Sequence, residues 1–294
     1  AARTRRELPA LLARAGSQDR TRPALAARDV VVRFGGVVAL DGAALEVYAG
    51  QVTALIGPNG SGKTTLLNVC SGFQTPNAGS IELAGVDVTR TPSHRRAAAG
   101  LGRTFQQPIV FTDLSGAENV MAGEMNNRPS SVAAAFRLPS SRRHERAAAQ
   151  RAEALLGALG VSHLVDRSAS KSSVADSKIL DLARALATDP CVLLLDEPAA
   201  GLGLDEVAVL EALVRATAQA GVAVLLVEHD VAFVGRIADR VVALERGRVI
   251  AEGTPAEVRS HPDVLRSYFG DVDLVRGSDE AEGRPAVAVE AEHD

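Results

Sequence analysis

The sequence contains, at residues 57–65, the stretch Gly57-Pro58-Asn59-Gly60-Ser61-Gly62-Lys63-Thr64-Thr65. An apolar run at 52–56 precedes this stretch and Leu66-Leu67 follows it, so the stretch connects a predicted strand to a predicted helix. Its glycines let the backbone curl until successive N–H groups point inward, at the positive end of the next helix. The spacing fits the phosphate-loop pattern G-x-x-x-x-G-K-[ST] without a gap. The chain is therefore predicted to bind a nucleoside triphosphate.

Two side chains of this loop have specific expected partners. Lys63 is expected to reach the β- and γ-phosphates, and the hydroxyl of Thr64 is expected to be a ligand of Mg²⁺. The backbone N–H groups are expected to surround the phosphates. The predicted nucleotide-binding residues of the loop are Gly57, Asn59, Gly60, Ser61, Gly62, Lys63, Thr64 and Thr65.

Composition excludes several classes of protein. A chain of 294 residues that is 46% hydrophobic has enough apolar material for a folded core. The formal net charge of −4 argues against a nucleic-acid partner held by bulk attraction. Cys70 and Cys191 lack C-x-x-C spacing, so neither a disulfide framework nor a zinc site is predicted. No apolar run approaches the roughly 20 residues of a transmembrane helix, so any membrane role is expected to be peripheral.

The two ends of the chain differ from its middle. Residues 1–25 carry six arginines against two acidic residues, with a short apolar patch at Leu8, Leu11 and Leu12. This segment is predicted to be a basic, flexible linker, and a segment lying at a membrane surface is the alternative. Residues 271–294 hold eight acidic and two basic residues and are predicted to be a disordered tail. The folded domain is expected over 26–270.

Within this domain, residues 30–48 alternate as strands do and predict a small antiparallel sheet beside the nucleotide. Phe34 lies in this region, in a chain with few aromatic residues. It is either a core residue of an amphipathic strand or a flat surface on which a purine stacks. Residues 107–188 are predicted to form a helical subdomain, with one helix over 142–159 that ends before Gly160. Fully apolar strands follow, which predicts an α/β fold with a parallel-sheet core.

Polar side chains stand at the ends of these core strands. Asp196 and Glu197 follow Val192-Leu193-Leu194-Leu195, and His229 ends the next strand. Asp196 is expected to hold Mg²⁺, and Glu197 to polarise the water that attacks the γ-phosphate. His229 is expected to contact the γ-phosphate or that water. Gln106 offers an amide oxygen to the metal or the water, so Gln106, Glu197 and His229 are the predicted catalytic residues.

Together these motifs resemble the ATP-binding subunits of ABC transporters. Within that superfamily the chain is similar to the branched-chain amino acid importer branch over about 28–270, through Gly102-Arg103-Thr104-Phe105-Gln106, Asp196-Glu197-Pro198-Ala199-Ala200-Gly201-Leu202, Val227-Glu228-His229-Asp230 and Gly253-Thr254-Pro255. The resemblance implies a P-loop NTPase (RecA-like) core with an antiparallel β-subdomain and a helical subdomain. It further implies ATP with Mg²⁺ as cofactors and Phe34 as the adenine-stacking aromatic residue.

One motif departs from the family. Its L-S-G-G-Q signature falls on Ser172-Ser173-Val174-Ala175-Asp176, where only the hydroxyl of Ser173 matches. In the family this loop meets the γ-phosphate of a partner subunit, so Ser173 is the residue expected to bind nucleotide in trans. Val174 and Ala175 add side chains where close approach needs glycine, and Asp176 adds a negative charge facing a negative ligand. A heterodimer with a second ATP-binding subunit that carries an intact signature is therefore favoured over a homodimer.

The resemblance implies an importer ATPase at the cytoplasmic face of the membrane. Its expected partners are integral-membrane permease subunits and, indirectly, an extracytoplasmic solute-binding protein, but not nucleic acid. Export of lipid or another apolar cargo is one alternative. A nucleotide-dependent regulatory module without transport is another, although the chain lacks the coiled-coil heptads and the second phosphate loop expected of such relatives.

Overall fold

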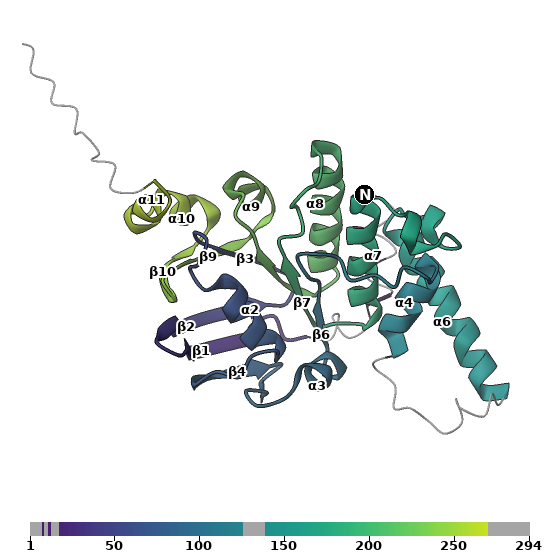
Figure 1. The fold of residues 1–294 in the computed structure, drawn as a ribbon, viewed down its shortest axis with the longest axis horizontal. Helices are drawn as coiled ribbons and strands as arrows, with labels where there is room; N and C mark the ends of the chain where they lie inside the picture. The colour runs from purple at the N-terminus through teal and green to yellow at the C-terminus, as the bar shows by residue number, and fades with distance from the viewer. Residues whose placement is uncertain (1–7, 9–10, 13–17, 126–138, 270–294) are drawn as a thin grey trace, which may run out of the picture.

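The computed structural model describes the chain except for residues 1–7, 9–10, 13–17, 126–138 and 270–294 (Figure 1). Two sheets and a group of helices make up the described part. In chain order the strands are β1 (Pro23–Phe34), β2 (Val37–Tyr48), β3 (Val52–Ile56), β4 (Ala78–Leu83), β5 (Val86–Asp87), β6 (Leu101–Arg103), β7 (Val192–Asp196), β8 (Ala223–Val227), β9 (Arg240–Glu245) and β10 (Arg248–Gly253).

The central sheet has six strands in the order β10-β9-β3-β8-β7-β6. All neighbours pair in parallel except β10, which is antiparallel to β9. Every residue of β3, β7 and β8 is buried, because both faces of the sheet are covered. This arrangement confirms the predicted α/β fold with a parallel-sheet core.

Successive residues of a core strand serve two different layers. Leu193 and Leu195 pack into a cluster with helices α6 (Pro139–Ala158), α7 (Val174–Ala187) and α8 (Leu204–Gln219), whereas Val192 and Leu194 pack into a second cluster with β1, β2 and α2 (Lys63–Ser71). The reason is the two-residue period of a strand, which points neighbouring side chains to opposite faces. The helices that surround the sheets are α2 (Lys63–Ser71), α3 (Ser93–Ala98), α8 (Leu204–Gln219) and α9 (Val231–Ile237).

The second sheet is antiparallel, in the order β2-β1-β4-β5, and lies beside α2 (Figure 1). It is the antiparallel β-subdomain that the resemblance implied. Its first strand begins at Pro23, so the domain start predicted at residue 26 falls within β1.

The helical subdomain is inserted between β6 and β7, within the predicted range 107–188. It contains α4 (Gly116–Met125), α6 (Pro139–Ala158), two short 3-10 turns (Ser162–Leu164 and Ala169–Lys171) and α7 (Val174–Ala187). The helix predicted over 142–159 corresponds to α6, which begins three residues earlier. Figure 1 shows α4, α6 and α7 gathered on the side of the molecule away from the second sheet.

The described parts of the two ends pack on the core. Leu8 and Leu12 are buried in the cluster that contains Leu155 and Leu186, which differs from a flexible linker at these two residues. The C-terminal helices α10 (Pro255–Ser260) and α11 (Pro262–Phe269) cover β3 and β9 through Val258 and Val264. The predicted acidic tail 271–294 lies outside the described residues. In the described part of the chain, no helix is both long and apolar enough to span a membrane.

Candidate nucleotide site

The loop between β3 and α2 is shaped by two glycines that no other residue can replace. Gly62 has a φ of 108°, and a Cβ on it would lie 2.6 Å from the carbonyl oxygen of Ala39. Gly57 has a φ of 151°, and a Cβ there would lie 2.1 Å from the carbonyl oxygen of Leu244. The loop is therefore threaded closely between β2 and β9, in a conformation that L side chains rarely adopt.

The N-terminus of α2 is suited to an anion. The first four N–H groups of a helix lack partners within it, and the helix dipole makes that end positive. α2 has no acidic residue in its first turn, and no side chain caps it. Asn59, Gly60 and Thr64 are exposed around this end, and Thr65 is half-buried. These residues therefore form an accessible cradle for phosphate groups.

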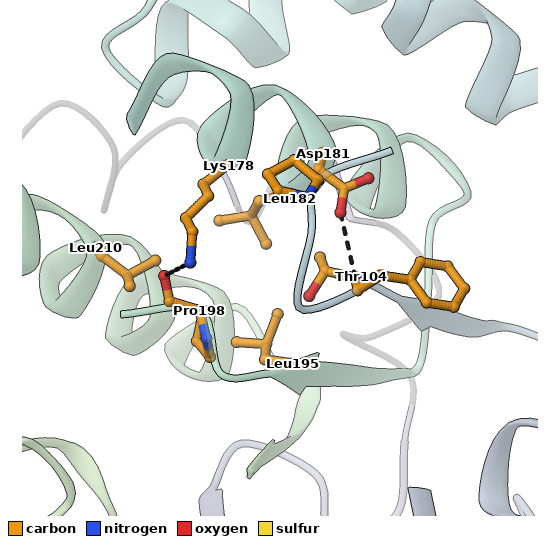
Figure 2. A pocket seen from close by; sticks show the side chains of 9 residues that line it. Thr104, Lys178, Asp181, Leu182, Leu195, Pro198 and Leu210 are labelled. Carbon is orange, nitrogen blue, oxygen red and sulfur yellow. Dashed lines mark hydrogen bonds between the residues drawn. The ribbon is translucent and has the colours of Figure 1, made fainter. Parts of the chain in front are cut away.

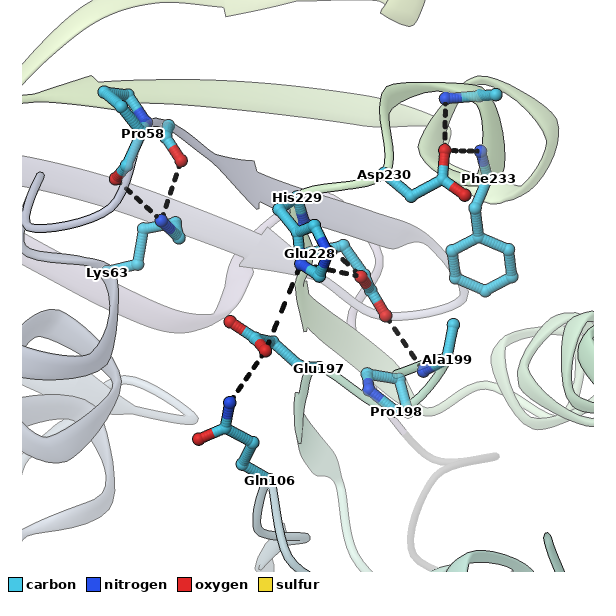
Figure 3. Close-up of polar contacts among 12 residues, drawn as sticks. Pro58, Lys63, Gln106, Glu197, Pro198, Ala199, Glu228, His229, Asp230 and Phe233 are labelled. Carbon is cyan, nitrogen blue, oxygen red and sulfur yellow. Dashed lines mark hydrogen bonds and ion pairs between the residues drawn. The ribbon is translucent and has the colours of Figure 1, made fainter. Parts of the chain in front are cut away.

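Two side chains of the loop are arranged for the same ligand. The Lys63 ammonium donates to the carbonyl oxygens of Gly57 and Pro58 at 2.7 and 3.0 Å (Figure 3). Burial lowers the pKa of Lys63, while the carboxylates of Glu197 and Asp196 raise it. The Ser61 hydroxyl is buried and has no hydrogen-bond partner among the described residues. A phosphate oxygen would satisfy this hydroxyl, so the loop fits a triphosphate.

Asp196 lies at the carboxyl end of β7 and is 6% exposed. Its Oδ2 is 3.3 Å from Nη2 of Arg103. Nη1 of the same guanidinium donates to the Ser71 hydroxyl at 2.5 Å. The same guanidinium lies over the rings of Phe73 and Phe105, at 5.4 and 4.8 Å from the centroids. Burial raises the pKa of Asp196, and Arg103 opposes this effect. Arg103 thus keeps a charge of opposite sign beside a nearly buried carboxylate.

The three predicted catalytic side chains come together (Figure 3). The amide nitrogen of Gln106 donates to Oε2 of Glu197 at 2.9 Å, and Nδ1 of His229 lies 4.0 Å from the same oxygen. Gln106 and His229 are exposed, while the Glu197 side chain is 21% exposed. A carboxylate that is open to solvent, beside an amide and an imidazole, can accept a proton from a water molecule.

Glu228 stabilises the backbone next to this group, and no sequence pattern predicted a role for it. It is 1% exposed, and its two carboxylate oxygens accept from the backbone N–H groups of Ala199 and His229 at 2.9 and 3.3 Å. Burial raises the pKa of Glu228, and these two hydrogen bonds lower it. The contact joins the segment after Glu197 to the residue that bears the imidazole, so it fixes both.

The oxygen donors that the sequence analysis proposed for Mg²⁺ are chemically suitable. Thr64 offers an exposed hydroxyl, Asp196 a carboxylate at a strand end, and Gln106 an amide oxygen. Mg²⁺ prefers hard oxygen ligands and keeps part of its shell for phosphates and water. The residues therefore fit the metal, and Asp196 is the only charged member of the set.

Two predicted nucleotide contacts lie outside this cluster. Phe34 ends β1 and is 51% exposed, so it is not a core residue. Ser173 is the N-cap of α7, where its hydroxyl accepts from the N–H of Asp176 at 3.0 Å. The next residue, Val174, is 60% exposed. These positions are compatible with contacts to an adenine base and to a second subunit, respectively.

Comparison with known proteins identifies the family. Residues 40–200 match the family model described as ABC transporter, and residues 248–273 match one described as branched-chain amino acid ATP-binding cassette transporter. The chain is 37% identical over 253 residues to the high-affinity branched-chain amino acid transport ATP-binding protein BraF of Pseudomonas aeruginosa. It is 35% identical over 253 residues to LivG of Escherichia coli, a protein of the same description. Each alignment covers 85% of this chain and 99% of the relative.

Solved structures agree with this match. A nucleotide-free ATP-binding cassette from an ABC transporter superposes with a TM-score of 0.74 at 32% identity, covering 85% of this chain and 100% of the other. An ATP-binding cassette in its ADP conformation gives the same score and identity over 85% and 99% of the two chains. Since the family model spans more than half of the sequence and the relatives align over nearly their whole length, this chain belongs to the ABC transporter family, as an ATP-binding subunit whose ATPase activity is coupled to transport.

Proposed function

We propose that this chain energises the import of branched-chain amino acids or related small polar solutes from the cytoplasmic face of the membrane. The observation that carries this substrate class is the match of residues 248–273 to the branched-chain amino acid cassette model, outside the general family match. The matched segment includes β10, α10 and α11, and it packs through Val258 and Val264 on the strands beside the phosphate loop. It is thus an integral part of the nucleotide-binding core.

In this mechanism the loop and the N-terminus of α2 hold the phosphates, and Lys63 neutralises charge on the β- and γ-groups. Glu197 accepts a proton from the attacking water as the oxygen of that water bonds to the γ-phosphorus, and the bond from this phosphorus to the β–γ bridging oxygen breaks, which releases ADP and phosphate. Gln106, hydrogen-bonded to Glu197, orients that water, and His229 contacts the γ-phosphate. Thr64, Asp196 and Gln106 would hold Mg²⁺, which supplies neutralisation of phosphate charge.

The proposed partners are integral-membrane permease subunits, which form the path of the solute across the membrane. An extracytoplasmic solute-binding protein is proposed as an indirect partner. The test is uptake in proteoliposomes that contain the chain with permease subunits and a second ATP-binding subunit from the same genome. We expect ATP-dependent accumulation of labelled leucine, isoleucine or valine that stops with Glu197→Gln in this chain. With ATP enclosed in the lumen, so that the ATP-binding subunits act from inside the vesicle, loss of solute from the lumen would indicate export. ATP hydrolysis independent of any permease or solute would indicate a regulatory module.

The second ATP-binding subunit is proposed to be a different chain. Val174 is exposed at the N-terminus of α7, and a valine side chain there keeps a phosphate from the close backbone approach that glycine permits. Asp176 adds a carboxylate, which lies 3.2 Å from Nε2 of His163. In a homodimer both nucleotide sites would meet this loop. In a heterodimer with a glycine-containing signature, the site with Lys63 and Glu197 receives the intact loop.

ATP-dependent dimer formation of Glu197→Gln chains, measured by light scattering, tests this assembly. We expect the chain alone to stay monomeric and a mixture with the sister subunit to form a 1:1 dimer. The combined variant Val174→Gly, Ala175→Gly and Asp176→Gln should gain self-association, with exposed Arg146→Gly as the matched control. Full dimerisation and hydrolysis by the unmodified chain alone would contradict the heterodimer.

A further inference from the structure

Lys178, one of the three lysines of the chain, is bound to the backbone of the catalytic segment. Its ammonium donates to the carbonyl oxygen of Glu197 at 3.1 Å and to that of Pro198 at 3.0 Å. Figure 2 shows the side chain reaching from α7 to Pro198, across a pocket that Leu182, Leu195 and Leu210 also line. The ammonium of Lys178 thus forms charge-assisted hydrogen bonds with two backbone carbonyl groups.

The backbone of Glu197 is in a conformation that needs such support. Its φ is 46°, in the left-handed region that a residue with a Cβ rarely adopts. The N–H of Glu197 donates to the carbonyl oxygen of Val227 on β8 at 2.9 Å. Lys178 therefore completes a clamp in which β8 holds the amide side of Glu197 and α7 holds the carbonyl side. The direction of the Glu197 side chain follows from this backbone placement.

The same face of α7 also contacts the segment of Gln106. Asp181, one helical turn after Lys178, accepts from the N–H of Phe105 at 3.4 Å. Gln106 is the next residue, and its amide donates to Glu197. One helix face thus contacts Glu197 and the residue that precedes Gln106, and the N-cap of that helix is Ser173.

We infer that Lys178 is a positioning residue for ATP hydrolysis, which aligns the Glu197 carboxylate through two backbone hydrogen bonds and makes that alignment depend on the position of α7. Contact of a second subunit with Ser173 and Val174 at the N-terminus of α7 is then transmitted over one helical turn to the chain's own Glu197. This inference rests on the proposed role of Glu197 as the base.

The variants that test it are Lys178→Met, which removes the donor and keeps an unbranched side chain, and Lys178→Arg, which retains charge and donors. Arg146→Met, at an exposed position on α6, is the matched control for charge removal in the helical subdomain. We expect Lys178→Met to lower kcat about tenfold with KM and ATP affinity unchanged, because displacement of a catalytic group affects the chemical step. Lys178→Arg should recover most of kcat, and Arg146→Met should match the parent.

A double-mutant cycle with Glu197→Gln distinguishes positioning from general support of the fold. If Lys178 acts through Glu197, Lys178→Met causes no further loss of the residual rate in the Glu197→Gln protein. If the two effects multiply, or if KM rises in parallel with the fall in kcat, the inference is wrong. Should Lys178→Met not fold, Lys178→Gln retains the two N–H donors of a neutral amide and is expected to give an intermediate kcat, and a parental kcat would overturn the inference.

The outcomes also separate this inference from the proposed function. Glu197→Gln with parental turnover would remove the base on which the inference rests. Glu197→Gln without turnover, together with Lys178→Met at parental turnover, would leave the proposed hydrolysis intact and overturn the role of Lys178 alone.

Discussion

At the scale of single residues, Lys63 shows how the phosphate loop is prepared for its ligand. Its ammonium already donates to the carbonyl oxygens of Gly57 and Pro58. The negative charges of Glu197 and Asp196 also attract it. We predict that Lys63→Ala lowers ATP affinity by about 10- to 100-fold, which corresponds to about 1.5–3 kcal/mol for a hydrogen bond to a charged group. Titration with a fluorescent ATP analogue measures this, with Arg146→Ala as control. Unchanged affinity would contradict the assignment of the loop.

Arg103 is a second residue whose role is defined by its contacts. Its guanidinium pairs with Asp196 where both side chains are less than 10% exposed. Arg103→Met is expected to lower the free energy of unfolding by about 3–5 kcal/mol, because it leaves a buried carboxylate without its counter-charge. Urea unfolding measures the change, and adding Asp196→Leu to the same chain should recover part of it. A loss below about 1 kcal/mol would mean that the pair is effectively solvated.

The sequence allowed some of these residues to be predicted and not others. Glu197 and His229 each follow an apolar run that ends in polar residues, and such a run predicts a strand end at a ligand site. Arg103 and Glu228 lie in the quoted motifs, but their partners are Asp196 and the N–H of Ala199, distant in the sequence. No local period reports contacts of this kind, so they became visible only in the folded chain.

At the scale of elements, α7 joins Ser173 at its N-cap to the proposed catalytic residue Glu197, and the same helix carries Asp181, whose pKa is raised. Burial raises the pKa of Asp181 to about 6 from 3.8, against the opposing effect of Arg184. The folded state therefore binds this proton more tightly than the unfolded state. The resulting penalty is fully present above about pH 6 and is relieved as the pH falls toward about 4.

Asp181→Asn isolates this effect. Relative to the variant, the parent should gain about 2 kcal/mol in free energy of unfolding between pH 7 and pH 4.5, since each unit of pKa difference is worth 1.36 kcal/mol. Chemical denaturation of both proteins across this range measures the difference, in which other titrating groups cancel. A difference in free energy of unfolding that does not change with pH would show that folding does not raise the pKa of Asp181.

At the scale of the whole molecule, the predicted architecture and the observed one agree in the two sheets and the inserted helices. Within the N-terminal segment, the described residues Leu8 and Leu12 are buried in the cluster that also contains Leu155 of α6. A short apolar patch among arginines has the same pattern on a membrane surface, in a linker or on a core. The sequence pattern alone does not distinguish these three environments. The folded chain adds a complementary surface, in which Arg151 also donates to the carbonyl oxygen of Leu11.

The measurement that tests the account most directly is ATP binding and ATP hydrolysis by Glu197→Gln, in complex with the second ATP-binding subunit. The amide preserves the shape of the side chain and removes the charge that accepts the proton. We expect ATP affinity within a few-fold of the parent and turnover at this site reduced by about 10²- to 10⁴-fold, the range that general-base catalysis contributes. Turnover within a few-fold of the parent would contradict the assignment of Glu197 and the proposed catalytic site.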